Sequence, residues 1–338
     1  MVTNIFQRIQ GSLAEKRQNL TEFLDSAPKE KIDLCCEDEH EVQAHLHVIE
    51  TALEKAEDET LGICTVCHGH IDPGHLEMDY TAHVCLDHFS EPERRRLEAE
   101  LELSQVVQRA LLPQITPEIP GVELAAFSRP AEIVSGDYFD FFHFRDGSHG
   151  LVIADIPGHG VSSGMLMSSL QAAIRTMAPE SDSPSDILKR INRFYIHNIH
   201  FTTFVTIFLA CFNSDTHALT YASAGHNPPV VVSKQGAQVT WLKPTAPSVG
   251  LAEEFNPRTE LITLERGDVL FLYTDGVTEA FNPVLEEFGT LRLAELLQKN
   301  SDLSASDIVQ AVRQGLEAFG DGHEMEDDTT FVALKISE

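Results

Sequence analysis

The stretch that decides the fold runs from Val152 to Gly160 and reads Val-Ile-Ala-Asp-Ile-Pro-Gly-His-Gly. Three apolar residues lead directly into Asp155, and two glycines then flank His159 before a segment, 161–177, with the pattern of a helix. A buried strand that ends in a carboxylate and turns through glycine holds that carboxylate on rigid backbone at the rim of a sheet. We therefore interpret Asp155 as a candidate functional acid.

Three further stretches place an acid at the end of a strand pattern. They are Ser135-Gly136-Asp137, the apolar run 269–273 followed by Thr274-Asp275-Gly276, and Asp327-Asp328 before the strand pattern 329–336. Aspartate oxygens are the ligands that Mg²⁺ and Mn²⁺ prefer. Four strand ends that each carry an aspartate predict a site for two divalent cations, about 3.5–4 Å apart, which can activate a water and hold a phosphoryl group for in-line attack.

The sequence lacks the motifs of two other common phosphate chemistries. It contains no Cys-x5-Arg loop for cysteine-based phosphate transfer and no Gly-x4-Gly-Lys-Ser/Thr phosphate loop. A cysteine nucleophile or a kinase-type nucleotide site therefore has no support. Hydrolysis by a metal-activated water needs only ligands from the protein, which is what the aspartates offer.

The net charge disfavours two classes of partner. The 338 residues carry 53 Asp and Glu against 24 Lys and Arg, a formal charge of −29. Binding to nucleic-acid phosphates or to an anionic membrane surface needs a basic face. No apolar run approaches the roughly 20 residues of a spanning helix, and Met1–Gln10 lacks the apolar stretch of a secretion signal. We expect a protein of the cytoplasm, in the cytosol. Its six cysteines are expected to form no disulfide framework.

From Gly121 onward, short strand patterns alternate with pairs of helix patterns. We expect strands at 122–128, 137–144, 149–156, 203–213, 217–223, 229–233, 238–242, 259–264, 268–274 and 329–336, and helices at 161–177, 184–199, 289–299 and 304–319. Consecutive strands joined by short turns pair antiparallel, and paired helices cover the sheets. The pattern predicts an α+β fold with two largely antiparallel sheets between two helix layers.

Residues 1–90 are expected to form a separate module that begins with a helical hairpin. Apolar residues recur at helical spacing over 4–25 and again over 33–59, and Ser26-Ala27-Pro28 separates the two runs. Two helices joined by so short a break predict an antiparallel hairpin.

A metal-binding pattern follows the hairpin. Cys64-x-x-Cys67 and Cys85-x-x-His88 are separated by 17 residues. Each pair offers two ligands from one side, and four such ligands complete a tetrahedron around Zn²⁺. A site closed by four protein ligands is structural, because it leaves no position for a substrate. His83 is the alternative to His88 as the fourth ligand.

Residues 91–117 are expected to form a linker helix. Ser90-Glu91-Pro92-Glu93 combines a capping serine, a first-turn proline and acids, and Pro113 ends the pattern. Apolar residues lie near heptad spacing between them, at Leu97, Leu101, Val106, Val107, Ala110 and Leu111. This spacing predicts a helix that pairs with its copy in a homodimer. The alternative is a single helix packed on its own domain.

Five motifs occur along residues 118–338. They are Gly136-Asp137-Tyr138-Phe139-Asp140, Ala154-Asp155-Ile156-Pro157-Gly158-His159-Gly160, Ser223-Ala224-Gly225-His226-Asn227-Pro228-Pro229, Tyr273-Thr274-Asp275-Gly276-Val277-Thr278-Glu279-Ala280 and Asp327-Asp328-Thr329-Thr330. In their order and spacing this segment closely resembles the metal-dependent protein phosphatases (the PPM, or protein phosphatase 2C, superfamily), above all the bacterial SpoIIE/RsbU branch. The resemblance implies a PPM-type αββα sandwich and two Mn²⁺ or Mg²⁺ ions.

The same resemblance implies a role for each matching acid. Asp155 would bridge both ions, and Asp137 would serve the second one. The backbone carbonyl of Ile156 would be a further ligand. Asp275 and Asp327 would hold the first ion. Asp137, Asp155 and Asp275 are thus the residues expected to carry catalysis.

Other motif residues leave alternatives open. Asp328 is the alternative to Asp327 as the last ligand. Asp140 is expected to cap a turn or strand rather than to bind an ion. His159 could donate a proton to the leaving serine or only shape its turn, and His226 is expected to shape its turn.

Two further expectations follow from the resemblance. Eukaryotic members place an arginine on the phosphate, and Arg129 is the nearest candidate here. Thr278, Glu279 and Ala280 follow a metal ligand and are expected in a mobile segment that sets substrate access.

The N-terminal module also resembles a known family. The segments Leu61-Gly62-Ile63-Cys64-Thr65-Val66-Cys67 and Thr81-Ala82-His83-Val84-Cys85-Leu86-Asp87-His88 are similar to the DksA/TraR-type zinc finger, with His88 where that family usually has a fourth cysteine. In that family the module can contact RNA polymerase. Here it is expected to dock or to sense.

These features together predict a Mn²⁺/Mg²⁺-dependent phosphoserine/phosphothreonine protein phosphatase whose N-terminal zinc module regulates it through the linker helix. By resemblance, the substrate is a phosphorylated STAS-type anti-sigma factor antagonist in a partner-switching pathway of stress response or development. One alternative is a regulator without catalysis that docks to RNA polymerase or another partner through the zinc module. A second alternative is a small-molecule phosphohydrolase.

Overall fold

The computed structural model describes residues 10, 13–14, 17–18, 21, 39–58, 60–71, 76, 81–131, 133–158, 160–199, 204–322 and 327–337. The chain divides into two compact units, Met1–Leu101 with His197–Thr202 and Glu102–Ile196 with Thr203–Glu338. The division falls inside α5 (Glu91–Leu111) and near the end of α7 (Pro184–Asn198).

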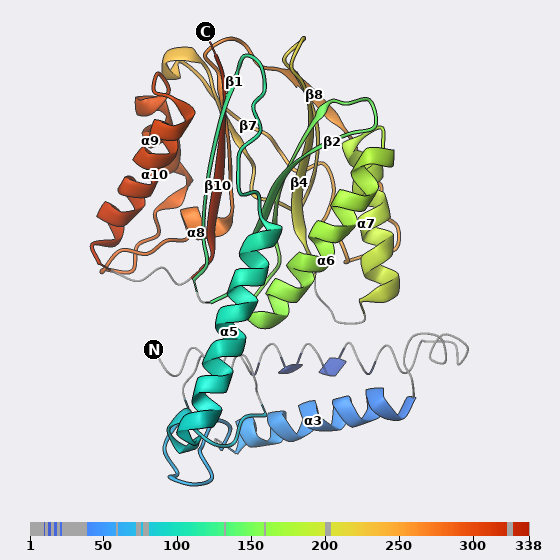
Figure 1. Ribbon diagram of the computed structural model, residues 1–338, viewed down its shortest axis with the longest axis vertical. Helices are drawn as coiled ribbons and strands as arrows, with labels where there is room; N and C mark the ends of the chain where they lie inside the picture. The colour runs from blue at the N-terminus through green and yellow to red at the C-terminus, as the bar shows by residue number, and fades with distance from the viewer. Residues whose placement is uncertain are drawn as a thin grey trace. The chain divides into compact units, whose positions relative to one another are not determined.

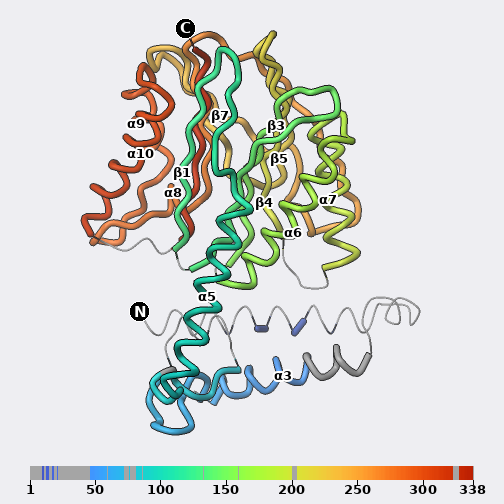
Figure 2. Tube along the Cα trace, viewed as in Figure 1, coloured from blue at the N-terminus to red at the C-terminus, as the bar shows by residue number. Residues whose placement is uncertain are grey.

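The second unit is built on two five-stranded sheets whose neighbouring strands are all antiparallel. The first sheet has the order β1-β10-β9-β6-β7 and comprises β1 (Val122–Arg129), β6 (Val230–Val232), β7 (Val239–Trp241), β9 (Val269–Tyr273) and β10 (Thr329–Ile336). The second has the order β2-β3-β4-β5-β8 and comprises β2 (Tyr138–His143), β3 (His149–Asp155), β4 (Thr206–Asn213), β5 (Ala218–Ala224) and β8 (Glu260–Thr263). Figure 2 traces the chain, with β1 beside β10.

A pair of helices covers the outer face of each sheet. In Figure 1, α6 (Val161–Met177) and α7 (Pro184–Asn198) lie against one sheet, and α9 (Gly289–Asn300) and α10 (Ala305–Gly320) lie against the other. The predicted α+β sandwich of two antiparallel sheets between helix layers is therefore confirmed.

The fully buried strand β10 shows why the layers form. Alternate side chains of a strand point to opposite faces of its sheet. Val332 and Leu334 belong to the core between the two sheets, whereas Phe331 and Ala333 belong to the core under α9 and α10. A strand buried on both faces in this way reads in the sequence as a continuous apolar run.

Most helix and strand limits follow the sequence patterns. α5 begins after Ser90, whose backbone N–H and hydroxyl both donate to the Glu93 carboxylate, and α10 begins after Ser304, whose hydroxyl accepts from the Asp307 N–H at 3.1 Å. β4 begins at Thr206, three residues later than the pattern at 203–213 predicts. The single-turn helix α8 (Asp275–Thr278) was not predicted.

The first unit contains α3 (Glu39–Glu57), which forms within the predicted helix 33–59. Ile49 and Leu53 of α3 pack in a small core with Leu61, Ile71 and Leu76. The other predicted helix of the hairpin, 4–25, lies largely outside the described residues, so the hairpin stays a prediction. Among the helices that the structure describes, none has both the length and the apolar character needed to cross a bilayer.

Candidate active site

The predicted acids lie at one end of the two facing sheets. Asp155 is the last residue of β3, and Asp137 precedes β2, whose Tyr138 pairs with Ala154. Asp275 follows β9 closely, and Asp327 precedes β10, whose Phe331 pairs with Tyr273 of β9. Antiparallel pairing puts the end of one strand beside the start of its neighbour. Each sheet therefore contributes two of the strand ends.

These carboxyl groups lie close enough to perturb one another. Burial raises the pKa of Asp137 well above its usual range, and the charges of Asp155 and Asp328 add to that effect. Burial likewise raises the pKa of Asp155, with further contributions from Asp275, Asp327 and Asp328. Burial also raises the pKa of Asp275. Uncompensated buried carboxylates are costly, so they are normally paired or bound to a metal.

The donor set fits divalent cations. The charged groups that act on the Asp137 and Asp155 carboxyls are all carboxylates, and carboxylate and carbonyl oxygens are the ligands of Mg²⁺ and Mn²⁺. The loop before β2 also approaches the backbone of Ile156, because a Cβ on Gly136 would collide with the Ile156 carbonyl oxygen. The predicted backbone ligand thus lies next to the segment that carries Asp137.

Asp137 is oriented by hydroxyl groups. Its Oδ2 accepts a hydrogen bond from Thr274 Oγ1 at 2.8 Å, and its backbone N–H donates to Ser135 Oγ at 3.0 Å. Thr274 Oγ1 in turn accepts from the Thr330 N–H at 3.1 Å. Since Thr274 follows β9 and Thr330 belongs to β10, the first sheet holds a carboxylate that the second sheet supplies.

The two acids before β10 have different surroundings. Asp328 is buried, and its carboxylate accepts from the Ala131 N–H at 2.8 Å and from the Gly136 N–H at 2.7 Å. Asp327 is exposed, and its Oδ1 accepts from the Asp328 N–H at 2.8 Å. The Asp328 carboxylate is therefore engaged by the backbone of the Asp137 loop, and this geometry favours Asp327 as the ligand.

Asp140 lies apart from the acids that perturb one another. It is fully buried in β2, where Arg175 of α6 donates to both of its oxygens at 2.6 Å and the Tyr138 hydroxyl donates at 2.7 Å. As expected of a residue that caps a strand, its Oδ1 also accepts from the Phe141 N–H, at 2.7 Å. Asp140 forms the ion pair that fastens α6 to the second sheet.

One contact of the linker helix was missed in the sequence. Gln108 of α5 is buried, and its side-chain amide donates to the Ser135 carbonyl at 2.7 Å and accepts from the Ser135 N–H at 2.9 Å. A Cβ on Gly164 of α6 would lie 2.9 Å from Gln108 Nε2. The sequence signal that could have predicted this contact was a glutamine on the less charged face of the predicted helix. Gln108 connects α5 to the loop that carries Asp137.

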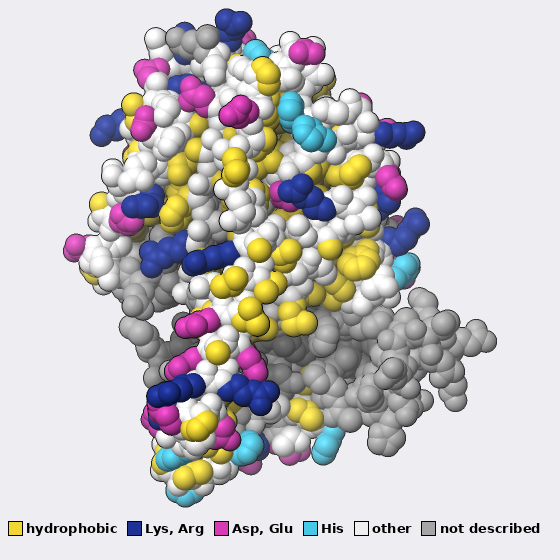
Figure 3. All heavy atoms as spheres, viewed as in Figure 1, with side chains coloured by type: hydrophobic (Ala, Val, Ile, Leu, Met, Phe, Trp, Pro, Cys, Tyr) yellow, Lys and Arg dark blue, Asp and Glu magenta, His cyan; other side chains and the backbone are white. Residues whose placement is uncertain are grey.

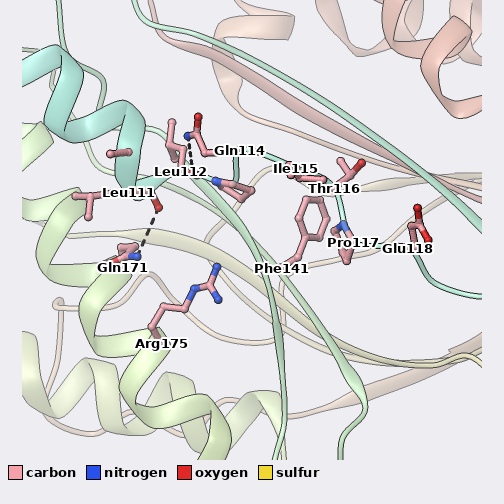
Figure 4. Close-up of a pocket in the computed structure, with 12 residues that line it drawn as sticks. Leu111, Leu112, Gln114, Ile115, Thr116, Pro117, Glu118, Phe141, Gln171 and Arg175 are labelled. Atoms are coloured by element: carbon pink, nitrogen blue, oxygen red, sulfur yellow. Dashed lines mark hydrogen bonds between the residues drawn. The ribbon is translucent and has the colours of Figure 1, made fainter.

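A cavity of the second unit lies elsewhere. It measures about 580 Å³ and is lined by residues 110–118 after α5, together with Phe141, Gln171 and Arg175. In Figure 4, Arg175 and Gln171 extend from α6 on one side, and the segment Gln114–Glu118 lies on the other side with Phe141. None of the metal-ligand candidates lines it, so this cavity is distinct from the acidic cluster.

The remaining motif residues fall around the acids. His226 is buried, with Nδ1 at 2.9 Å from Thr206 Oγ1, and burial lowers its pKa to about 3. A neutral buried imidazole of this kind supports the structural role predicted for it. Glu279 acts on the Asp155 carboxyl, and Asp275 acts on the Glu279 carboxyl. Arg129 is an exposed residue paired with Thr329. His159 lies outside the described residues.

The second predicted metal site lies in the first unit. The ligand atoms of Cys64, Cys67, Cys85 and His88 all lie within 4.8 Å of one another. Desolvation acts to raise the pKa of Cys64, but N–H groups directed at its sulfur lower it to about 6. Thiolates that accept backbone hydrogen bonds are typical zinc ligands. The Cys₃His set is compatible with zinc.

The second unit is similar to proteins of a known family. The family described as Stage II sporulation protein E (SpoIIE) matches residues 145–337. The phosphoserine phosphatase RsbU of Bacillus subtilis (strain 168) is 30% identical over 245 residues, which cover 72% of this chain and 71% of RsbU. The matched family segment includes Asp155, Asp275 and Asp327 and begins after Asp137.

Two solved structures have a similar fold. The SiaA-PP2C domain of Pseudomonas aeruginosa has a TM-score of 0.64 at 22% identity, over 72% of this chain and 98% of that chain. The RsbU and RsbW domains of Rv1364c from Mycobacterium tuberculosis have a TM-score of 0.56 at 27% identity, over 65% of this chain and 61% of that chain. The αββα arrangement is shared with both.

Proposed function

Since the chain belongs to the SpoIIE family of PP2C-type protein phosphatases, we propose that it hydrolyses phosphoserine or phosphothreonine in a protein substrate. The PP2C family is metal-dependent, typically with Mn²⁺ or Mg²⁺. The observation that carries the proposal is the group of mutually perturbing carboxyls contributed by the strand ends of both sheets.

We propose that Asp137, Asp155, Asp275, Asp327 and the Ile156 carbonyl would hold the two ions. In this assignment Asp155 would serve both ions, Asp137 would serve the second, and Asp275 and Asp327 would serve the first. When bound, such ions lower the pKa of a water to near neutrality and stabilise the charge on the phosphoryl oxygens. Because the ligands are fixed before the substrate binds, the ion site does not have to rearrange during the reaction.

The other residues of the site act on the ligands. Thr274 fixes one oxygen of Asp137 by its 2.8 Å hydrogen bond. Asp328 holds the loop that carries Asp137 through two backbone N–H groups. Gly136 allows that loop to approach the Ile156 carbonyl. Each contact restricts a ligand to one position, which is the preorganisation that electrostatic catalysis needs.

The substrate proposed is a phosphorylated STAS-type anti-sigma factor antagonist. Support comes from the resemblance to the SpoIIE/RsbU branch and from the similarity to RsbU, which is named a phosphoserine phosphatase. The site's excess of carboxylates suits a neutral or basic substrate surface better than an acidic one. Dephosphorylation of such a substrate would be a step in partner switching.

The first unit is proposed to be a regulatory module with a structural zinc ion. Zinc bound by three thiolates and an imidazole would hold the turns around Cys64 and Cys85 together. A cysteine pattern with the spacing of a metal site, rather than of a disulfide framework, supports a cytosolic location. The likeness to the DksA/TraR zinc finger remains a prediction.

The linker helix is proposed to pair with its copy in a homodimer. Leu103, Val106 and Val107 of α5 are exposed, and Figure 3 shows hydrophobic side chains gathered over the C-terminal part of α5 and over α6. An apolar stripe on a helix is stabilised by burial against a second helix. Sedimentation of Val106→Glu beside the wild-type chain tests this, and an unchanged mass would contradict pairing.

Phosphate release tests the proposed function. A phosphorylated STAS-domain protein is incubated with the chain in Mn²⁺, in chelator, and with Asp155→Asn in Mn²⁺. We expect turnover only for the wild-type chain with Mn²⁺. Turnover in chelator, or a wild-type rate equal to that of Asp155→Asn, would contradict the proposal. Comparing the phosphoprotein with a nucleoside monophosphate separates a protein phosphatase from a small-molecule phosphohydrolase.

A further inference from the structure

The chain folds back on itself just after α8. Phe281 and Glu287 form an antiparallel bridge, and the Asn282 N–H donates to the Glu286 carbonyl at 3.1 Å. The Leu285 N–H donates to the Asn282 carbonyl at 2.8 Å. Residues 282–286, here named the 282–286 turn, therefore form a closed turn at the end of a short two-stranded ladder.

The 282–286 turn is held in one conformation. Asn282 Oδ1 accepts from the backbone N–H groups of Val284 at 3.1 Å and Glu286 at 2.9 Å. Arg292 of α9 lies 3.6 Å from the Glu286 carboxylate and donates to the Glu287 carbonyl at 2.9 Å. A side chain that bonds its own turn and a helix that ties its base both restrict the backbone. The 282–286 turn therefore has a defined conformation, and it follows closely on Thr278, Glu279 and Ala280, whose mobility stays a prediction.

The tip of this turn is apolar and conformationally unfavourable. Val284 is 73% exposed and Leu285 is 68% exposed. Leu285 has φ of 62°, in the left-handed region that favours glycine or asparagine. An exposed leucine with a left-handed backbone adds little to the stability of the fold. Residues with a strained backbone of this kind cluster at functional sites. The side chain therefore needs a role outside the fold.

The base of the 282–286 turn belongs to the acidic site. Glu279, three residues before the turn, acts on the Asp155 carboxyl, and the charges of Asp275 and Glu287 add to the effect of burial in raising the pKa of Glu279. A protein that delivers a phosphoserine to these carboxylates has to lay the surrounding surface over the rim of the site. The turn starts from that rim, because the Glu279 N–H donates to the Asp275 carbonyl at 2.8 Å and the Phe288 N–H closes the segment by donating to the Ala280 carbonyl at 2.8 Å.

We propose that Val284 and Leu285 form a docking element for the phosphorylated substrate protein, an inference that rests on the proposed function. The pair would contact an apolar patch next to the phosphoserine. Glu279 precedes the element and Glu287 follows it, each with a negative charge, so a partner surface with neutral or basic residues around that patch is complementary. A small aryl phosphate reaches the acids without contacting the turn, so the turn contributes nothing to its binding.

Leu285→Gly tests this docking element. Glycine removes the apolar contact and relieves the left-handed backbone, so the melting temperature should be at least that of the wild-type chain. We expect kcat/KM on a phosphorylated STAS-domain protein to fall about tenfold, mainly through KM, which corresponds to about 1.4 kcal/mol. The rate on p-nitrophenyl phosphate should stay within about twofold. Val284→Ser should show the same split between the two substrates.

Leu261→Gly is the matched control. Leu261 is 65% exposed on the edge strand β8, and its replacement should leave both substrates unaffected. Equal kcat/KM of Leu285→Gly and wild type on the phosphoprotein would overturn the docking element, as would equal losses on both substrates. A wild-type chain that hydrolyses neither substrate would instead refute the proposed function. Hydrolysis of the aryl phosphate alone would refute the protein substrate and its docking element together.

Discussion

At the scale of single residues, neighbouring acids in one motif have different tasks. Asp328 is buried and bound to two backbone N–H groups, whereas Asp327 is exposed beside the cluster. The sequence Asp327-Asp328 left both as candidates for the last ligand. Only the partners of the Asp328 carboxylate, which come from a loop nearly 200 residues away, separate the two acids.

Exchanging each of these acids for asparagine should therefore give two different phenotypes. Asp327→Asn is expected to lower kcat in Mn²⁺ by about 100-fold or more, with little change in melting temperature, because it removes a charged ligand from an exposed position. Asp328→Asn is expected to lower the free energy of unfolding by about 1–3 kcal/mol, because one of two buried N–H groups loses its acceptor. Paired thermal melts and Mn²⁺ titrations of activity measure both effects. The reverse pattern would make Asp328 the ligand.

His226 predicts a pH dependence of stability. Burial lowers its pKa to about 3 in the folded chain, against about 6.5 when unfolded. The folded state then binds fewer protons than the unfolded state between these values. Stability is full above pH 6.5 and declines as the pH falls towards 3. At pH 5 the loss should be about 2 kcal/mol, from the difference in pKa values.

Urea unfolding at pH 7 and pH 5 measures this effect. His226→Gln removes the titrating group and keeps an amide that can bond Thr206. The loss of stability between the two pH values should be smaller in this variant by about 2 kcal/mol. The same pH slope in both proteins would show that His226 does not titrate as its burial demands.

At the scale of helices and strands, α5 reaches the active site directly. The Gln108 amide satisfies both backbone groups of Ser135 in a buried position. Gln108→Leu keeps the size of the side chain and leaves both groups unpaired, at a cost of about 1–3 kcal/mol for each. We expect a higher Mn²⁺ concentration for half-maximal activity and a lower kcat, with KM for p-nitrophenyl phosphate little changed.

A matched variant separates this effect from a general loss of helix packing. Arg109 follows Gln108 on an exposed position of α5, so Arg109→Leu should leave the Mn²⁺ dependence unchanged. If Gln108→Leu lowers stability without shifting the Mn²⁺ titration, then Gln108 supports the fold and does not position the Asp137 loop.

The sequence was sufficient to predict those elements whose own pattern decides them. The helix at 161–177 and the strand at 329–336 have the predicted limits, because apolar period and terminal residues are local signals. The Gln108 contact and the Arg175–Asp140 ion pair depend on which side chains meet across elements. No local period encodes such a meeting, so both had to come from the structure.

The 282–286 turn illustrates a further limit of the sequence. Its Asn282 is a typical turn residue, but Val284 and Leu285 are of residue types that are usually buried in a core. The left-handed backbone of Leu285 follows from the closure of the ladder and the contacts with α9. The position of an exposed leucine at the rim of the site was therefore not predictable.

At the scale of the whole molecule, the two units should respond separately to metal removal. A zinc-selective chelator is expected to release one zinc per chain and to reduce the helical circular-dichroism signal of the first unit, because ligand closure contributes on the order of 10 kcal/mol to such small modules. Cys67→Ser should bind no zinc. Cys211→Ser, which alters a thiol of β4 outside the Cys₃His set, should keep its zinc. Zinc retention by Cys67→Ser would contradict the ligand set.

The most direct measurement of the central claim is the number of Mn²⁺ ions bound by the zinc-loaded chain, determined by calorimetry alongside phosphate release from a phosphorylated STAS-domain protein. We predict two Mn²⁺ per wild-type chain, with turnover appearing as the sites fill. Asp155→Asn should bind at least one ion fewer and lose turnover by about 100-fold or more. Two tightly bound Mn²⁺ in Asp155→Asn, or full turnover by the metal-free wild-type chain, would contradict the assignment of the acidic cluster as a two-metal phosphatase site.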